Sequence, residues 1–216
     1  MCANYVPVTD PDRLRLFFAV VRGDPLPPET WPGYAAPFVR RARDAAGYDR
    51  EGAVGLFGLV PHWSKDLAIG RRTYNARSET AAEKPSFRDA WRYGRRAIVP
   101  AESIFEPNWE TGRAVRWRIA RRDGRPMGIA GLWGAWRGPD GGELLSFTML
   151  TVNADGHELM QRFHKPQDEK RMVVVLDEAD YDRWLDAPQD AAPEFLARYP
   201  ADALHAEPAP KPPAAR

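Results

Sequence analysis

The sequence predicts one α+β domain, built mostly of short strands with helices on the outside of the sheet. Several apolar segments are short or alternate with polar residues, which is typical of strands. Only a few segments carry the i, i+3, i+4 apolar spacing of a helix. The 216 residues include 44% hydrophobic residues and eight Trp, which supply enough apolar surface for a single core and more than a disordered chain carries.

The first elements are expected close to the start of the chain. Thr9 is predicted to cap a helix, because Asp10 and Pro11 follow it and Pro is favoured in a first helical turn. The apolar run at residues 14–21 fits either a helix or a strand. Residues 24–37 contain five prolines and are expected to form a loop.

Six strands are predicted farther along. The sequence AVGLFGLV at residues 53–60 indicates a buried strand, and residues 115–120 alternate as a half-buried strand does. A turn at Gly124 and Arg125 is expected to lead into the strand that follows. The predicted strands cover residues 53–60, 97–100, 115–120, 127–136, 144–152 and 172–176.

Two later segments predict short helices. Ser86 is expected to cap a helix over residues 86–93. The apolar residues on the inner face of this helix are Phe87, Ala90 and Trp91. Residues 177–185 predict a second helix, which begins at Asp177 and packs Trp184 inward.

The chain is predicted to divide into a domain at residues 2–199 and a tail at residues 200–216. The tail is rich in Ala and Pro and ends EPAPKPPAAR, so it is expected to be disordered. No stretch approaches the roughly 20 apolar residues of a membrane helix, and the first residues lack the pattern of a signal peptide. These features predict a cytoplasmic protein without membrane contact.

The composition also excludes several kinds of site. Lys plus Arg number 31 and Asp plus Glu number 30, and the resulting charge of +1 argues against a general polyanion binder. One cysteine forms neither an internal disulfide nor a Cys-rich zinc site, and the four His lack metal-ligand spacing. We therefore expect no metal and no cofactor.

The single cysteine, Cys2, follows the initiator Met. Removal of Met1 is expected, because Cys is small, and it leaves an amine and a thiol on one residue. Such a 1,2-aminothiol condenses with an aldehyde to an imine and then closes to a thiazolidine ring, a step that intramolecularity accelerates. An α-amino pKa of about 7.7–8.0 leaves part of the amine neutral near pH 7. The same residue is also a candidate N-terminal nucleophile for amide hydrolysis.

Several separated segments, in order along the chain, resemble the SOS-response-associated peptidase (SRAP) family. They are MCANY at the start, FGLVPHW (57–63), YNARSET (74–80) followed by SFRDAW, VPAESIFEPNW (99–109), GIAGLW (128–133), and TMLTVNA with FHKPQDEKRMVVVL (148–154 and 163–176). The joint order of these segments with Cys2 is specific. The resemblance extends from residue 2 to about residue 185.

The resemblance implies twisted, mainly antiparallel strands around one cleft, with Cys2 at the cleft floor. It also implies catalytic roles. Asn75 would hold the Cys2 backbone or the sugar, and Glu106 would act as acid and base on the opened deoxyribose. His164 would assist proton transfer, and a positioned acid or base accelerates such steps by about 10²–10⁴.

The implied function is that of an abasic-site sensor in DNA damage repair. The protein would cross-link through Cys2 to abasic sites in single-stranded DNA, or at junctions of single and double strands, and would shield the lesion as a monomer. Autopeptidase and abasic-site lyase activities accompany this function in the family. Arg77 would contact the phosphate beside the lesion, and the further DNA contacts are Trp63, Trp109, Lys165 and Arg171.

Three departures from the family pattern are expected to affect residues that contact DNA more than the chemistry of Cys2. Ala3 and Asn4 replace a Gly-Arg pair, so an arginine at position 4 is missing. The tryptophan of the Tyr-Glu-Trp motif moves two residues on, to Trp109. Extra residues follow His164 and leave either Lys165 or Arg171 in place of the usual arginine. We expect altered DNA affinity before lost reactivity.

Other interpretations remain open at this stage. A run of six arginines fits either a phosphate-binding groove or a solvated face. These arginines are Arg113, Arg116, Arg118, Arg121, Arg122 and Arg125. An alternative function is an N-terminal-nucleophile peptidase or amidohydrolase that uses Cys2. A second alternative is a non-catalytic reader of modified or single-stranded DNA, in which Cys2 is irrelevant.

Overall fold

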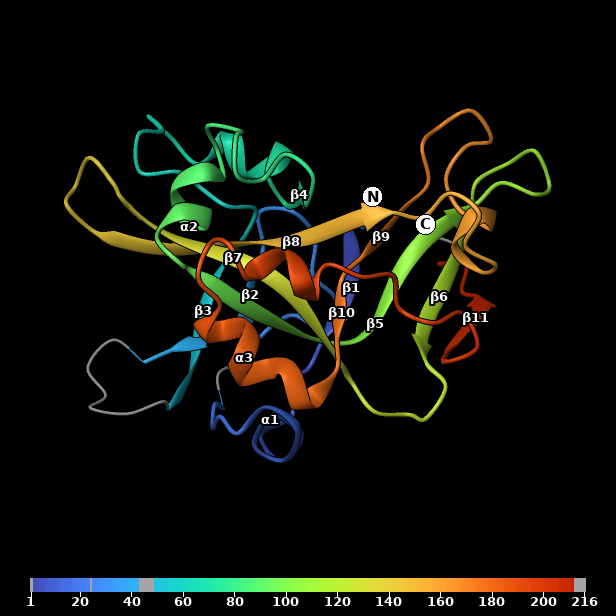
Figure 1. The fold of residues 1–216 in the computed structure, drawn as a ribbon, viewed down its shortest axis with the longest axis horizontal. Helices are drawn as coiled ribbons and strands as arrows, with labels where there is room; N and C mark the ends of the chain where they lie inside the picture. Colours follow the sequence, from blue (N-terminus) through green and yellow to red (C-terminus); the bar gives the residue numbers. More distant parts are fainter. Residues whose placement is uncertain (1, 24, 43–48, 212–216) are drawn as a thin grey trace, which may run out of the picture.

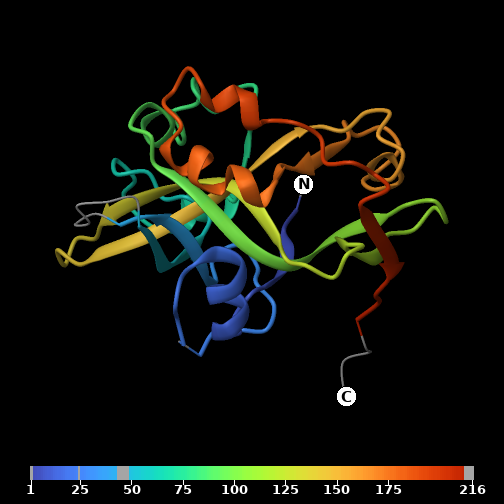
Figure 2. The same cartoon turned by 60° about the horizontal axis from the view of Figure 1, so that its bottom comes forward.

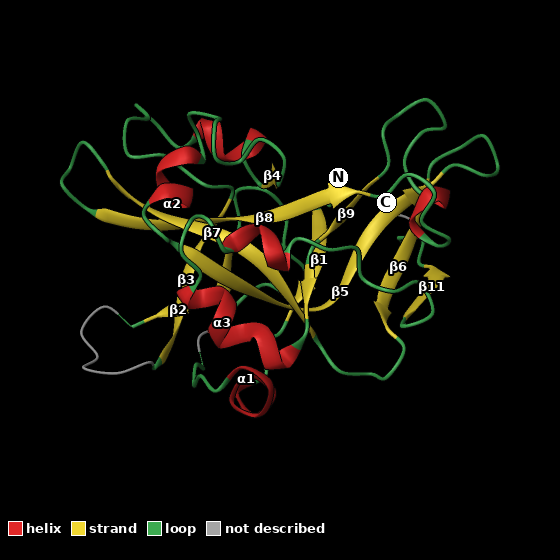
Figure 3. Cartoon of the chain, viewed as in Figure 1, coloured by secondary structure: helices red, strands yellow, loops and turns green. Residues whose placement is uncertain are grey.

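One continuous sheet organises the structure, with short helices at its periphery (Figures 1 and 3). The computed structural model describes residues 2–23, 25–42 and 49–211. Within these residues the strands are β1 (Asn4–Pro7), β2 (Ala35–Arg41), β3 (Arg50–Phe57), β4 (Asn75–Arg77), β5 (Arg96–Asn108), β6 (Val115–Arg121), β7 (Met127–Arg137), β8 (Glu143–Asn153), β9 (Arg171–Val173), β10 (Val175–Leu176) and β11 (Leu204–Pro208). The helices are α1 (Pro11–Phe18), α2 (Arg88–Arg92) and α3 (Tyr181–Asp186), with short 3₁₀ turns η1 (Ala68–Arg72), η2 (Met160–Arg162), η3 (Glu178–Asp180) and η4 (Ala192–Phe195).

The sheet is mainly antiparallel and closes on itself. Neighbouring strands follow the path β7, β8, β3, β2, β5, and β5 pairs again with β7, which completes the circuit. Among the described strands, β3 and β4 run parallel to β8, and the other pairings are antiparallel. The predicted α+β class with mainly antiparallel strands is confirmed.

β5 is the central strand of the fold and is longer than the predicted residues 97–100. Its first half pairs with β7, whereas its second half pairs with β1 on one side and β6 on the other (Figure 2). This change of partners carries the strand beyond the closed part of the sheet to Asn108. Burial extends along nearly its whole length and includes polar residues such as Arg96, Ser103 and Glu106.

The N-terminal segment forms a helix, and its cap lies one residue later than predicted. The Asp10 carboxylate accepts a hydrogen bond from the Arg13 N–H at 2.9 Å, and Pro11 takes the first helical position. The helix ends where Ala19 adopts a left-handed conformation with φ 57°. Phe18 stacks on Tyr181 with ring centroids 5.5 Å apart, so α1 lies against α3 (Figure 1).

Two of the strand predictions are corrected by close backbone approaches. β3 ends at Phe57 rather than at residue 60, because Gly58 has φ 125° and a Cβ there would collide with the carbonyl of Gly70. The predicted strand at 172–176 breaks at Val174, whose N–H donates to Leu150 while its carbonyl accepts from Ala130. The two halves therefore join different neighbours, β9 with β8 and β10 with β7.

Other predicted boundaries also move. The proline-rich loop ends earlier than residue 37, because β2 pairs with β3 from Ala35 onward. Ser86 does not cap α2, which begins at Arg88, although the predicted inner face is buried. Asp177 makes no side-chain cap, and a 3₁₀ turn precedes α3. Trp184 packs inward as predicted, and its indole N–H donates to the carbonyl of Ala97 at 2.8 Å.

Part of the predicted disordered tail is an ordered strand. Residues 204–208 form β11, which pairs antiparallel with β6 from Leu204 opposite Arg121 to Pro208 opposite Trp117. The composition did not reveal this strand, because an exposed edge of β6 supplies the hydrogen-bonding partners. Residues 212–216 lie outside the described residues. None of the helices in the described ranges combines the length and the apolar character that crossing a membrane requires.

Candidate active site

Strands β1 and β5 bring Cys2 and Glu106 to the same place. The two strands pair antiparallel with Asn4 opposite Phe105, so the residues just before Asn4 face those just after Phe105. Cys2 is 1% exposed, and its thiol donates to the carbonyl of Asn4 over 3.5 Å. Glu106 is 3% exposed, which is rare for a carboxylate and requires compensation nearby.

His164 provides that compensation from a distant part of the chain. Its Nε2 lies 3.0 Å from Oε2 of Glu106, and the histidine is 9% exposed. The backbone also holds it in place, because the His164 N–H donates to the carbonyl of Pro107 at 2.9 Å and Phe163 bridges to Asn108. With φ 64°, His164 has the left-handed conformation that histidine tolerates better than most residues.

The extra residues after His164 form a loop that is stabilised by hydrogen bonds from a lysine to its own backbone. The ammonium of Lys170 donates to the carbonyls of Phe163 at 3.0 Å and Lys165 at 2.7 Å. Figure 1 shows this loop beside the tip of the β5–β6 hairpin, where Arg162 and Glu110 form an ion pair at 2.9 Å. The longer sequence is therefore accommodated without moving the histidine away from Glu106.

Tyr74 approaches this centre from just before β4, and Asn75 is the first residue of that strand. Burial raises the pKa of the Tyr74 hydroxyl, and the negative charges of Glu106 and of a Cys2 thiolate raise it further, so this ring lies within their electrostatic reach. The Asn75 amide donates to the carbonyl of Tyr74 at 2.9 Å, and its own oxygen is buried without a partner among the described residues. An unpaired buried oxygen is costly and is suited to accept a hydrogen bond from a ligand.

The electrostatics of the centre keep the thiol protonated. Burial raises the pKa of the Cys2 thiol well above its ordinary value, and the negative charge of Glu106 adds to the effect. A reaction that needs the thiolate must therefore remove this proton during the reaction. Glu106 is the carboxylate whose charge acts on this thiol, and the Nε2 atom of His164 lies 3.0 Å from Oε2 of Glu106.

Two hollows flank the Glu106–His164 pair. Glu106 helps line a mostly apolar hollow of about 320 Å³. Its other lining residues are Ala3, Asn4, Trp31, Phe105, Pro107, Ala114 and Arg116. His164 helps line a more polar hollow of about 390 Å³ with Trp109 and Lys170. The pair therefore lies between two concave surfaces of different character.

The structure places the other predicted DNA contacts at different depths. Lys165 lies near Trp109, with its ammonium 5.4 Å from the ring centroid, and Trp109 borders the hollow beside His164. Arg77, at the end of β4, is half exposed and pairs with Glu169 at 2.7 Å. Trp63 is 48% exposed on the turn after β3, where its indole N–H donates to a backbone carbonyl.

Arg171 differs from the other predicted DNA contacts because it is buried. Its guanidinium forms a two-pronged pair with Glu79, at 2.9 and 2.8 Å, and also contacts Glu169 and Thr151. Its side chain is 3% exposed. A guanidinium held this way fixes the loop at Glu79 against β8 and β9, and it presents little surface to a phosphate.

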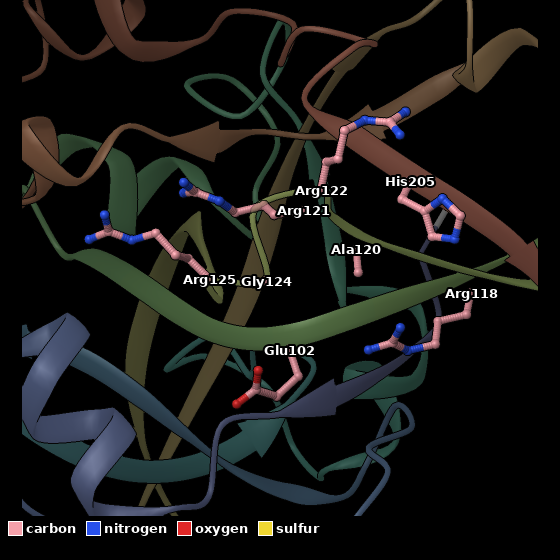
Figure 4. Close-up of a pocket in the computed structure, with 8 residues that line it drawn as sticks. All are labelled: Glu102, Arg118, Ala120, Arg121, Arg122, Gly124, Arg125 and His205. Atoms are coloured by element: carbon pink, nitrogen blue, oxygen red, sulfur yellow. The ribbon is translucent and has the colours of Figure 1, made fainter.

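Five of the six arginines in the run lie at two places along β6 and the turn that follows it. Arg116 belongs to the apolar hollow near Glu106, whereas four arginines line a separate hollow of about 350 Å³ at the other end of the strand (Figure 4). These four are Arg118, Arg121, Arg122 and Arg125. Arg121 pairs with Asp123, and Arg125 pairs with Glu178. In Figure 4 the side chain of Arg122 points away from those of Arg121 and Arg125. We call this second region the arginine pocket.

Arg116 brings a cation to residue 4, where the sequence itself has none. Its Nη2 lies 2.8 Å from the side-chain oxygen of Asn4 and 2.8 Å from Glu29, and its guanidinium carbon lies 3.3 Å from the ring centroid of Phe105. Sequence reasoning did not single out Trp31 or Tyr74, and it named Arg116 only as a member of the arginine run. Tyr74 lies inside a recognised motif, but Arg116 and Trp31 reach the site only through the pairing of strands and loops.

Among the described residues, no group of three or more His, Cys, Asp or Glu is arranged to hold a metal ion. The fold and the site define a sheet-dominated protein with a buried thiol beside a carboxylate–imidazole pair. The family model described as SOS response associated peptidase (SRAP) matches residues 1–211, and the chain belongs to this family.

Named relatives and solved structures agree with this membership. The chain is 35% identical over 141 residues to the abasic site processing protein YoqW of Bacillus subtilis, covering 65% of this chain and 59% of YoqW. It is 28% identical over 185 residues to the abasic site processing protein HMCES of Pongo abelii, covering 71% of this chain and 50% of HMCES. The chain thus matches between half and three fifths of the length of these relatives.

A crystal structure of a protein from Bordetella bronchiseptica has a TM-score of 0.90 and 41% identity, covering 96% of this chain and 99% of that one. A structure from Bacteroides thetaiotaomicron, at 20% identity and a TM-score of 0.79, shares the fold over 95% of this chain and 90% of that one.

Proposed function

We propose that this protein processes abasic sites in DNA by forming a covalent bond between Cys2 and the lesion. The observation that carries the proposal is the burial of the Cys2 thiol next to the Glu106–His164 pair, in a chain whose relatives are named abasic site processing proteins. The buried centre also suits this substrate in size. An abasic residue lacks its base, so its sugar can approach a thiol that a complete nucleotide cannot reach.

The chemistry begins with removal of Met1, which frees the α-amino group of Cys2. The neutral amine adds to the aldehyde of the ring-opened deoxyribose, and loss of one water gives an imine. The sulfur then attacks the imine carbon, forming the C–S bond while the nitrogen gains a proton. The product is a thiazolidine, and no oxidant or reductant is consumed.

The centre supplies the proton transfers that these steps require. Because the thiol is held protonated, its proton must leave as sulfur attacks, and Glu106 with His164 accepts it and returns a proton to the nitrogen. The same pair assists the departure of water from the preceding adduct. The unpaired oxygen of Asn75 accepts a hydrogen bond from the sugar or from the Cys2 backbone.

Single-stranded DNA, or a junction with duplex DNA, is the proposed partner of the monomeric protein in the cytoplasm. The half-exposed Arg77 contacts a phosphate beside the lesion. Trp109 and Lys165 lie together beside His164, where an aromatic face and a cation suit a neighbouring nucleotide. Trp63 provides a more distant exposed ring, and Arg171 supports the site by positioning Glu79 and Glu169. Covalent attachment would shield the lesion.

A denaturing gel tests the proposal. The protein without Met1 is incubated with single-stranded DNA containing one abasic site, beside Cys2→Ala, Cys2→Ser and a form with an N-terminal extension that resists processing. The expected result is a heat-stable band of reduced mobility for the parent alone. Mass spectrometry of the adduct should show the mass of protein plus DNA minus one water.

The same experiment separates the alternatives. Equal cross-linking by the extended form would rule out the aminothiol mechanism. Tight binding by Cys2→Ser with no covalent product in the parent would indicate a non-catalytic DNA reader. Hydrolysis of an amide substrate without any DNA adduct would indicate a peptidase or amidohydrolase. Strand cleavage on the gel measures lyase activity, and the mass of the protein's N-terminus measures self-processing.

A further inference from the structure

The apolar hollow beside Glu106 has walls from four separate parts of the chain, the first of which is the N-terminal segment with Ala3 and Asn4. Trp31 comes from the loop before β2, Phe105 and Pro107 come from β5, and Arg116 comes from β6. Its volume of about 320 Å³ falls in the lower range for small-ligand sites. Because Glu106 belongs both to this hollow and to the reactive centre, a ligand here lies immediately beside the sugar attached to Cys2.

The surfaces of the hollow are flat and mostly apolar. Trp31 offers an indole, and the guanidinium of Arg116 lies over the Phe105 ring with its carbon 3.3 Å from the ring centroid. Aromatic faces and guanidinium planes are the surfaces on which nucleic-acid bases stack without sequence preference. A ligand with a flat π-system suits these walls.

Cations lie at the same hollow. Arg116 is fixed by Asn4, by Glu29 and by the carbonyl of Ala209, which accepts at 3.2 Å. Lys211 places its ammonium 4.1 Å from the centroid of the Trp31 ring. Glu29 balances the charge of Arg116, and Lys211 adds a second cation close to the aromatic walls. A flat base attached to a phosphate matches this combination of surfaces.

We propose that this hollow is a subsite for the base of the nucleotide next to the abasic residue. The proposal rests on the function proposed above, which places the lesion at Cys2. The neighbouring base stacks on Trp31 and on the Arg116 guanidinium, and its phosphate lies toward Lys211. The subsite thereby fixes the lesion relative to Cys2 and aids recognition without reading sequence.

A paired change in protein and DNA tests this subsite. Fluorescence anisotropy at one fixed salt concentration gives the Kd of single-stranded DNA whose lesion is tetrahydrofuran, an analogue without an aldehyde that forms no imine. In two further oligonucleotides, the base on the 5′ or on the 3′ side of the lesion is also replaced by tetrahydrofuran. Trp31→Ala, Trp31→Phe and Arg116→Ala are compared with the parent, and Tyr93→Ala, at an exposed ring beyond α2, serves as the matched control.

For the parent, removing the neighbouring base on one side should weaken binding by about 5- to 150-fold, the range of base–aromatic stacking. Trp31→Ala should bind the intact oligonucleotide more weakly and lose most of this dependence on the neighbouring base. Trp31→Phe should retain much of it, and Arg116→Ala should reduce it. Tyr93→Ala should match the parent.

Equal affinity of the parent for all three oligonucleotides would overturn the subsite. So would an unchanged dependence in Trp31→Ala. A parallel reaction of the parent with authentic abasic DNA keeps the two proposals distinct. Absence of an adduct there contradicts the function proposed for Cys2, whereas an adduct combined with indifference to the neighbouring base contradicts only the subsite.

Discussion

The Cys2 centre and the arginine pocket both contain charged groups, but these groups are buried at the centre and closer to solvent in the pocket. At the centre, Glu106 and His164 are almost completely buried, and the charge of Glu106 acts on the buried thiol of Cys2. In the arginine pocket, Arg125 is half exposed where it pairs with Glu178, and Arg121 is mostly covered but pairs with the half-exposed carboxylate of Asp123, so solvent screens both pairs.

The two regions differ in how far their polar groups are removed from solvent. Buried polar groups are expensive, and they persist at the centre because β1, β5 and the loop of His164 hold them together. The arginine pocket is conspicuous in the sequence, yet its ion pairs each contribute little. A high density of charged residues in the sequence therefore points to the arginine pocket, whose ion pairs contribute little free energy. Burial in the structure points to the Cys2 centre, whose polar groups interact away from solvent.

The largest expected effect comes from breaking the Glu106–His164 pair. Glu106→Gln should slow covalent adduct formation by about 10²–10⁴ and should flatten its dependence on pH, because the general acid–base group is lost. Single-turnover rates on abasic DNA between pH 5 and pH 9 measure both. Glu102→Gln is the matched control on the same strand, since Glu102 pairs with Arg13 outside the centre. Identical pH profiles for parent and Glu106→Gln would contradict the assignment.

His164 requires a substitution that respects its backbone. His164→Asn keeps a residue that tolerates the left-handed conformation while removing the imidazole. It should slow adduct formation by about 10²-fold or more. It should also lower the free energy of unfolding by about 1–3 kcal/mol, because the buried Glu106 carboxylate loses its imidazole partner. Adduct-formation rates close to those of the parent would show that Glu106 transfers the thiol proton of Cys2 without His164.

Arg171 provides the next largest effect, on stability. Arg171→Met should lower the free energy of unfolding by about 1–3 kcal/mol, because Glu79 and Glu169 lose a buried hydrogen-bonding partner. Arg125→Met, in the arginine pocket, should change it by less than about 1 kcal/mol. Urea unfolding followed by tryptophan fluorescence measures both variants. Equal losses would remove the distinction between the buried and the exposed guanidinium.

The pairing of Glu79 with Arg171 also predicts a dependence of stability on acid pH. Hydrogen bonds from Arg171 lower the pKa of Glu79 from 4.5 to about 2. The ionised carboxylate therefore favours the folded state above pH 4.5, and this contribution declines as the pH falls toward 2. Glu79→Gln should lose less stability than the parent between pH 6 and pH 3, with the exposed Glu83→Gln as control. A parallel decline in parent and Glu79→Gln would argue against the pair.

The smallest effect is expected in the arginine pocket. Because Arg125 is committed to Glu178, Arg125→Ala should leave the Kd for single-stranded DNA within about twofold and the salt dependence of binding unchanged. Titrations at several salt concentrations measure this. A salt slope lowered by about 1 would instead show a phosphate contact and would restore the groove that the sequence suggested.

The class of fold and most of the strands could be predicted from the sequence alone, and so could a set of candidate site residues. Alternation and short apolar runs predicted β6, β7 and β8 closely, because these signals depend on which face of a strand is buried. Cys2, Asn75, Glu106 and His164 were chosen from separated motifs, and the structure brings Cys2, Glu106 and His164 into one buried centre.

Features that depend on partners far away in the chain became visible only in the folded structure. The ordering of β11 required the free edge of β6, and the placement of Arg116 at Asn4 required β1, β5 and β6 to lie side by side. The burial of Arg171 and the exposure of Arg77 likewise follow from packing rather than from residue type. Local sequence sets propensity and chemistry, whereas burial and charge pairing arise when distant strands meet.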